Sequence, residues 1–231
     1  MRDHLSFSAI KQFAKSPNHL IAYDAKIFEP SKAMKFGTMF HTYLLEREEF
    51  DNRYEVEDID RRTKVGKAAA KKIESEGKEV CTRSDFSRIT AMSAACKSII
   101  NLDGYLREVL KEGMIGGQKF VGRIDAIGEN TVIDVKTTQD ASPREFSRAS
   151  FQHQYHLQAA IYKELCGVEN VAFLAVESAA PYNAVLHTCS KDLLLYGAEK
   201  LETLIASYEN WDGMPEGYGD NNLLTLPPYA L

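Results

Sequence analysis

The stretch that most restricts the fold runs from residue 119 to residue 136, where apolar and polar side chains alternate on both sides of a short turn. Alternation with a period of two is typical of β-strands. Glu129-Asn130, preceded by Gly128, matches a two-residue hairpin turn. We therefore expect two antiparallel strands that lie side by side in the sheet.

The register of this hairpin places charged side chains together. A two-residue turn at 129–130 sets Asp125 opposite Asp134, and alternation puts Lys136 on the same face. Like charges directly opposite each other are destabilising, and a bound divalent cation would compensate them. Carboxylate oxygens suit Mg²⁺ or Mn²⁺, and a lysine beside the metal can orient water or offset phosphoryl charge. The alternative is an ordinary charged surface on which Lys136 pairs with Asp134.

The rest of the chain predicts helices first and strands later. A proline at the first helical position, after the N-cap Ser16, starts a helix at Pro17. The order of elements predicts an α/β or α+β fold with a central mixed β-sheet flanked by helices, in a single domain over 1–231. Its parts are a mainly helical region (1–111), a sheet with helices (112–211) and an irregular tail (212–231). The expected helices are 17–25, 34–49, 84–100, 103–111, one from Ser142, 151–166 and 191–211, and the expected strands are 113–115, 119–127, 131–136, 171–177 and 184–189.

Composition excludes several classes of protein. Hydrophobic residues make up 44% and charged residues 26%, which is the balance of a globular protein with a sizeable core. There is no apolar run long enough to cross a bilayer and no secretory signal, so we expect no membrane association and a cytoplasmic location. The four cysteines form no CxxC pair, which disfavours zinc ribbons and redox motifs. A net charge of −5 neither indicates nor excludes binding of nucleic acid, because phosphate binding depends on local patches of charge.

Other polar residues have both a functional and a plainer interpretation. His41 lies on a mostly apolar predicted helix, where it is either a metal ligand or a core histidine with a hydrogen bond to backbone. Three further side chains share one face of a predicted helix at i, i+4 and i+8, beside the hairpin or simply facing solvent: Gln154, Gln158 and Tyr162. A basic helix face is either a DNA contact or a solvated surface, and carries Lys64, Lys67 and Lys71.

Four short motifs together resemble those of a known family. In order, they are Gly37-Thr-x-x-His41, Gly122-Arg-x-Asp125, Asp134-Val-Lys136-Thr-Thr and Gln158-x-x-x-Tyr162. They resemble the RecB-like branch of the PD-(D/E)XK nucleases, and within it the family of the exonuclease VIII (RecE) nuclease domain and its phage relatives, which is similar to lambda exonuclease. The resemblance extends roughly from residue 6 to residue 211.

This resemblance implies a restriction-endonuclease-like core and roles for individual residues. The metal, Mg²⁺ or Mn²⁺, would be bound by His41, Asp125, Asp134 and the carbonyl of Val135. Lys136 would be catalytic, and the two aspartates would act with it. The remaining assignments are support of the site or the substrate strand by Gln158 and Tyr162, and a DNA contact by Arg123.

The resemblance also implies an activity and partners. Members of the family degrade linear double-stranded DNA from the 5′ end in phage-type recombination, so we expect such an exonuclease in a bacterial cell. A ring-forming homo-oligomer and a single-strand annealing protein are the implied partners. No iron–sulfur cluster is expected, because the cysteine spacing does not resemble that of the CRISPR-associated iron–sulfur nucleases. Two alternatives remain: a non-catalytic DNA-binding scaffold, and a structure-specific or restriction-type endonuclease of the same fold.

Overall fold

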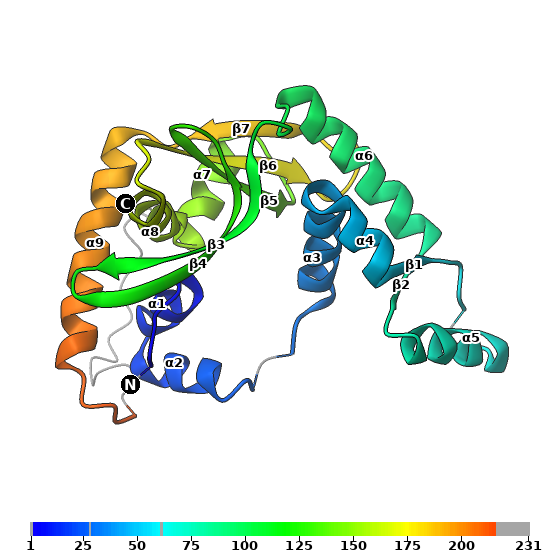
Figure 1. Cartoon of the computed structure of the whole chain (residues 1–231), viewed down its shortest axis with the longest axis horizontal. Coiled ribbons are helices and arrows are strands. Elements are labelled where there is room, and N and C mark those ends of the chain that lie inside the picture. The colour runs from blue at the N-terminus through cyan, green and yellow to red at the C-terminus, as the bar shows by residue number, and fades with distance from the viewer. Residues whose placement is uncertain (1, 28, 61, 216–231) are drawn as a thin grey trace, which may run out of the picture.

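Five strands form a mixed sheet at the centre of the molecule in the order β3-β4-β5-β6-β7 (Figure 1). The computed structural model describes residues 2–27, 29–60 and 62–215. All neighbouring strands are antiparallel except β5 and β6, which are parallel. The expected mixed sheet is confirmed. Its strands are β3 (Leu106–Ile115), β4 (Gln118–Ile127), β5 (Thr131–Thr138), β6 (Asn170–Glu177) and β7 (Ala184–Thr188).

The predicted hairpin between β4 and β5 has the expected register at its turn end. Ala126 pairs with Ile133, and Ile127 pairs with Val132. The turn is closed by a hydrogen bond from the Gly128 N–H to the Thr131 carbonyl at 2.8 Å. The ladder then stops, so Asp125 does not pair with Asp134 as the sequence predicted. A continued ladder would set two carboxylates directly opposite each other, and the separation of the strands avoids that repulsion.

One face of the sheet is covered by α1 (Phe7–Phe13), α2 (Pro17–Asp24), α7 (Pro143–Gln152), α8 (Tyr155–Cys166) and α9 (Lys191–Asn210). Ser16 caps α2 as predicted, since its hydroxyl accepts a hydrogen bond from the His19 N–H. Apolar side chains of these helices and of the strands form what we call the first core. Its largest members are Leu5, Ile10, Leu20, Phe120, Ile124, Leu157, Ile161, Phe173 and Tyr208.

The opposite face is covered by α3 (Lys32–Leu45), α4 (Arg47–Arg53) and α6 (Arg83–Ile99). Beyond them lies a small arm made of α5 (Lys64–Ser75) and a parallel pair of short strands, β1 (Tyr54–Val56) and β2 (Glu79–Cys81) (Figure 1). We call the apolar cluster on this side the second core. It contains Phe40, Leu44, Leu45, Phe50, Ile89, Met92, Ala126, Ile133, Val135 and Leu174.

Three helix predictions were wrong. Residues 103–111 are largely part of β3, because β3 pairs with β4 along nearly its whole length and this pairing outweighs local helix propensity. The helix expected over 34–49 is two helices, broken at Glu46, whose φ of −130° and ψ of 68° are not helical. The helix expected over 151–166 is likewise divided, because Gln154 has a left-handed backbone with φ of 58°.

The end of the chain is described only to residue 215. Residues 212–215, the described part of the tail predicted to be irregular over 212–231, belong to no helix or strand. The remainder of that tail, 216–231, lies outside the described residues. None of the helices described is long and apolar enough to span a membrane.

Candidate active site

The gap between β4 and β5 is filled by a side chain. Asp125 is buried, and its Oδ2 atom accepts a hydrogen bond from the backbone N–H of Val135 at 2.6 Å. Along β4, Ile124 packs in the first core and Ala126 in the second, so the usual alternation of side chains breaks at Asp125. The carboxylate therefore lies between the two faces of the sheet, where groups from either face can reach it.

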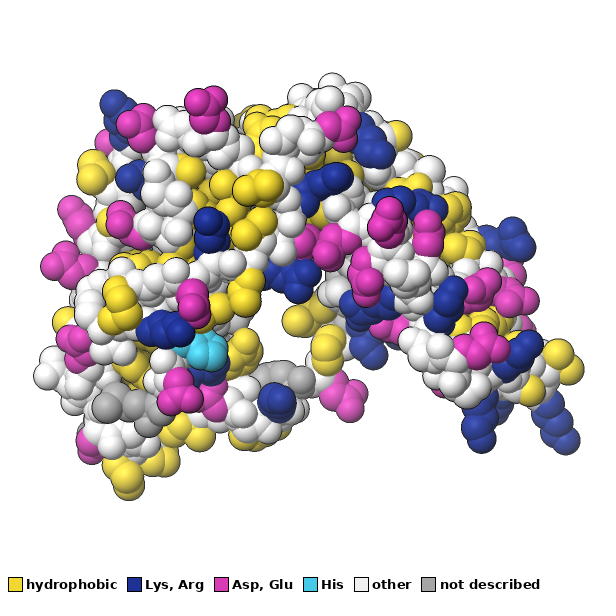
Figure 2. Space-filling view, viewed as in Figure 1, with side chains coloured by type: hydrophobic (Ala, Val, Ile, Leu, Met, Phe, Trp, Pro, Cys, Tyr) yellow, Lys and Arg dark blue, Asp and Glu magenta, His cyan; other side chains and the backbone are white. Residues whose placement is uncertain are grey.

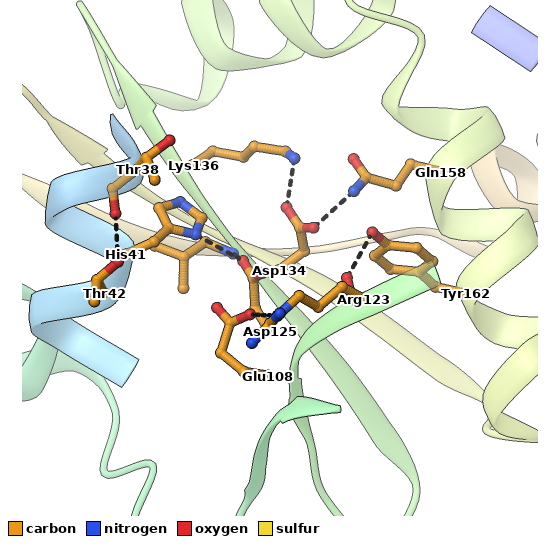
Figure 3. Close-up of polar contacts among 11 residues, drawn as sticks. Thr38, His41, Thr42, Glu108, Arg123, Asp125, Asp134, Lys136, Gln158 and Tyr162 are labelled. Atoms are coloured by element: carbon orange, nitrogen blue, oxygen red, sulfur yellow. Dashed lines mark hydrogen bonds and ion pairs between the residues drawn. The ribbon is translucent and has the colours of Figure 1, made fainter. Parts of the chain in front are cut away.

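His41 and a second carboxylate meet Asp125 at this gap (Figure 3). The Nδ1 atom of His41, on α3, lies 3.5 Å from Asp125 Oδ2. Single ligand atoms of His41, Glu108 and Asp125 all lie within 4.8 Å of one another. The structure thus brings two of the predicted metal ligands together and adds Glu108, which the sequence reasoning missed.

Glu108 was missed because its segment was expected to be helical. It lies on β3 with a φ of 52°, an uncommon conformation for a residue other than glycine. Its carboxylate accepts a hydrogen bond from Arg123 Nε at 2.5 Å, and Arg123 Nη2 lies 3.3 Å from Glu46 Oε1. Arg123, the expected DNA contact, is thus ion-paired with two carboxylates at the rim of the site.

Asp134 lies next to this group with a different set of partners. Its Oδ1 atom accepts a hydrogen bond from Gln158 Nε2 at 2.7 Å, and Oδ2 lies 2.6 Å from the Lys136 ammonium (Figure 3). The hydroxyl of Tyr162 donates to the Arg123 carbonyl at 3.1 Å. Asp134 and Lys136 alternate with Ile133 and Val135 of the second core, so these two share a sheet face as predicted.

The row predicted on a single helix face is only partly present. Gln158 and Tyr162 lie on α8, one turn apart, and both reach the region of the site. Gln154 precedes α8 with its left-handed backbone and therefore does not continue the row. Val135 donates its N–H to Asp125, and a role for its carbonyl in metal binding stays a prediction.

Burial and neighbouring charges shift the pKa values at the site. Burial alone would lower the pKa of His41, but the carboxylates of Asp125 and Asp134 raise it overall. Burial would raise the pKa of Asp125, but the charge and proximity of His41 outweigh this and lower it. Burial, together with the charge of Asp125, raises the pKa of Asp134 to about 6 although Lys136 opposes the shift. Asp125 is therefore the more readily ionised of the two aspartates.

A cavity of about 1090 Å³ lies beside these groups, between α1, α3, β3, β4 and β5. The surface is visibly hollowed between the part that carries α1 and α2 and the part that carries α3 and α4 (Figures 1 and 2). His41, Glu108, Asp125 and Lys136 all contribute to the wall of this cavity. The volume is slightly above the usual range for small-molecule sites, about 300–1,000 Å³, which leaves room for a substrate beside the polar groups.

The donor set at the gap suits a divalent cation. One imidazole nitrogen of His41 and one carboxylate oxygen each of Glu108 and Asp125 lie close enough to share an ion. Asp125 and Asp134 are both buried, and their neighbouring negative charges would gain most from a bound cation. Carboxylates match Mg²⁺ and Mn²⁺, and the imidazole adds a donor typical of transition metals. The residues present therefore fit a metal of this class.

The comparisons with known proteins agree with this geometry. Residues 6–213 match the family of PDDEXK-like domains of unknown function, DUF3799. The chain belongs to this family. The DUF3799 domain is thereby a member of the PD-(D/E)XK nuclease superfamily, as the motifs indicated.

A solved structure shows the same fold as this DUF3799 domain. A candidate exonuclease from Eubacterium rectale is 14% identical, with a TM-score of 0.66 over 97% of this chain and 90% of that one. A phage-related exonuclease from Haemophilus somnus is 13% identical (TM-score 0.32), covering 64% of this chain and 85% of that one. A TM-score that low supports no conclusion about fold or function. No protein of curated function matches the sequence.

The basic residues of the arm lie apart from the cavity. Lys64, Lys67 and Lys71 are exposed on α5, whose buried residues are Gly66, Ala70 and Ile73. Lys and Arg side chains gather on the surface at the end of the arm, where α5 lies (Figure 2). The predicted helix face is therefore present, and its contact with DNA stays a prediction.

Proposed function

We propose that this DUF3799 domain is a metal-dependent DNA exonuclease that hydrolyses phosphodiester bonds of linear double-stranded DNA from the 5′ end. The observation that carries the proposal is the meeting of His41, Glu108 and Asp125 beside the Asp134–Lys136 ion pair, on the wall of an open cavity. The polarity and the duplex substrate come from the resemblance of the motifs to exonuclease VIII alone, and the description of the Eubacterium rectale protein supports only an exonuclease.

In this proposal His41, Glu108 and Asp125 hold Mg²⁺ or Mn²⁺, and Asp134 and the Val135 carbonyl are further ligands. A cation bound there would lower the pKa of water and stabilise charge on the phosphate. The N–H of Val135 holds Asp125 in place, so the carboxylate needs little reorganisation to bind. Glu108 would exchange part of its interaction with Arg123 for the cation, since its carboxylate already lies within the group.

Lys136 is the proposed catalytic lysine. Its ammonium lies 2.6 Å from Asp134 Oδ2 and 4.6 Å from the centre of the Tyr155 ring, and it also lines the cavity. A compact cation there can orient an attacking water and offset charge that grows on the phosphoryl oxygens. Gln158 fixes the other oxygen of Asp134, and Tyr162 ties α8 to β4 through the Arg123 carbonyl. These two are positioning residues.

The decisive experiment compares linear and covalently closed circular duplex DNA of one sequence, with Mg²⁺ or Mn²⁺ and with a label at either 5′ or 3′ ends. We expect degradation of the linear DNA alone, with early release of the 5′ label and none in Asp125→Asn. Cleavage of the circle would assign an endonuclease. Binding of both forms with no cleavage under either metal would assign a DNA-binding scaffold.

The proposed setting is phage-type recombination in a bacterial host cell. A ring-forming homo-oligomer and a single-strand annealing partner belong to this part of the proposal and come from the resemblance alone. The mass of the protein in solution by light scattering tests the ring. A single subunit at all concentrations would remove that part and leave the nuclease chemistry unaffected.

A further inference from the structure

One face of α8 meets the candidate site at three points. Tyr155, Gln158 and Tyr162 lie at i, i+3 and i+7 of the helix, so they share that face. Gln158 donates a hydrogen bond to Asp134, and Tyr162 donates one to a backbone carbonyl of β4. Tyr155, the first residue of the helix, therefore takes the place in the row that the sequence predicted for Gln154.

The Tyr155 ring contacts the Lys136 ammonium. The Nζ atom lies over this ring at 4.6 Å from its centre, and it lies 5.9 Å from the centre of the Phe173 ring. The two rings are stacked, with centres 5.2 Å apart and planes inclined by 30°. Phe173 is buried and is the register partner of Asp134 on β6, so it supports the Tyr155 ring from the sheet. The ammonium is thus attracted both by aromatic faces and by the Asp134 carboxylate.

These two attractions differ in what competes for them. The Asp134 carboxylate, 2.6 Å from Lys136 Nζ, is also a proposed metal ligand. A divalent cation on this carboxylate would weaken its attraction for the ammonium, because the two cations repel each other. Aromatic rings are not ligands of Mg²⁺ or Mn²⁺, so their contact with the ammonium would remain. Only 18% of the Lys136 side chain is exposed, and a cation–π contact is stronger where water is excluded.

We propose that Tyr155 is a positioning residue, whose ring holds the Lys136 ammonium on the cavity wall when the metal site is occupied. This inference rests on the proposed function and extends it, because it makes the position of the catalytic lysine depend on α8 as well as on Asp134. Both side chains line the cavity, so the ammonium held in this way faces the space for the substrate. The face of the ring carries the effect, and the hydroxyl is not required.

The first test is nuclear magnetic resonance of the whole protein with isotope-labelled lysine. Protons that lie above an aromatic ring are shifted upfield by the ring current, so the end of the Lys136 side chain should give an upfield signal. The signal that is missing from Lys136→Arg identifies this lysine. We expect the upfield shift in wild type and in Tyr155→Phe, before and after addition of Mg²⁺, and a large decrease of the shift in Tyr155→Leu.

The second test compares single-turnover cleavage of linear duplex DNA in Mg²⁺ with DNA affinity in Ca²⁺. We expect Tyr155→Leu to cleave about tenfold more slowly, the equivalent of about 1.4 kcal/mol, with affinity little changed. Tyr155→Met, which fills more of the space left by the ring, should lose as much, and Tyr155→Phe should keep the rate. The matched control Phe13→Leu removes a ring of the first core that packs on Tyr208 and Trp211, and it should also keep the rate.

Several results would overturn the positioning role of the ring. They are a wild-type rate in Tyr155→Leu and Tyr155→Met, an equal loss in Phe13→Leu, and a wild-type Lys136 signal without the upfield shift. A loss in Tyr155→Phe as large as that in Tyr155→Leu would assign the effect to the hydroxyl instead. In each case cleavage by the wild-type protein would still support the nuclease. A wild-type protein that cleaves no DNA with either metal would overturn both proposals.

Discussion

The carboxylate of Asp125 accepts the backbone N–H of Val135 at 2.6 Å, across the point where β4 and β5 stop pairing. A side chain thus replaces a ladder hydrogen bond in the middle of the sheet. The buried N–H of Val135 therefore keeps a hydrogen-bond partner, and the Asp125 carboxylate still lies close to His41 and Glu108. The cost of opening the hairpin is thereby offset at the position where the proposed metal is bound.

Removal of a carboxylate from the gap should weaken metal binding. We expect Asp125→Asn and Glu108→Gln each to lower the affinity for Mn²⁺ by about 10–100-fold or more, as loss of groups that tune a metal site does. Asp134→Asn should also weaken it. Glu112→Gln, on the same strand but paired with Lys119, is the control. Calorimetric titration measures the affinity, and wild-type values in all three site variants would dismiss the assignment.

Lys136 should matter for chemistry more than for binding. Lys136→Ala should slow cleavage by about 10²–10³, the usual loss for one positioned electrostatic group, with DNA affinity in Ca²⁺ little changed. Lys136→Arg should not restore the rate, because a planar guanidinium does not replace a compact ammonium. Single-turnover rates at saturating protein give the comparison. A cleavage rate of the alanine variant within a few-fold of wild type would show that Lys136 is an ordinary charged residue without a catalytic role.

Stability without metal should depend on pH through Asp134. Its pKa is raised to about 6, so the folded protein binds a proton that the unfolded chain releases near pH 4. That contribution is present at low pH and is lost as the pH rises from about 4 through 6. Asp134→Asn keeps a neutral side chain throughout and should therefore gain stability relative to wild type over this window, on the order of 2–3 kcal/mol. Urea unfolding in the presence of a chelator gives the free energy of unfolding of both proteins at pH 4 and pH 7. A difference between variant and wild type that is the same at both pH values would contradict the prediction.

The basic face of α5 should act only on DNA long enough to reach the arm. A variant with Lys64, Lys67 and Lys71 changed to Ala should bind a long duplex more weakly and with a flatter salt slope, but bind a short duplex like wild type. The reason is that α5 lies at the far end of the arm from the cavity. Anisotropy measurements in Ca²⁺ compare the two lengths. Equal slopes for variant and wild type on the long duplex would leave these lysines as solvated surface.

The packing of α9 on α8 allows no side chain at Gly197. An added Cβ would lie 2.2 Å from the His156 carbonyl oxygen, so the two helices would have to move apart. Gly197→Ala should therefore destabilise the fold by about 1–3 kcal/mol or more, as overpacking does. Gly104→Ala meets nothing within 4 Å and is the control. Thermal unfolding measures both, and equal melting temperatures would show that the helices are less closely packed.

The sequence was most informative where local and long-range preferences agree. Strict alternation and a two-residue turn fixed the β4–β5 register near the turn, and so placed Asp134 and Lys136 on one face. Glu108 could not be predicted as a site residue, because Leu, Arg, Glu and Lys around it favour a helix locally. Only pairing with β4 makes the segment a strand. Glu108 and Gln154 both have a positive φ, and neither is a glycine, the residue by which a sequence usually indicates such a backbone conformation.

His41 reaches the gap from α3, which packs on the second core, whereas Gln158 comes from α8 and the first core. The centre is thus completed only while two independently packed layers keep their alignment across the sheet. A displacement of one layer along the sheet would change the distance between the His41 imidazole and the Gln158 amide even if both layers stayed folded. Nuclease activity should therefore depend on that alignment. Substitutions in either core can then lower the activity of a protein that remains folded.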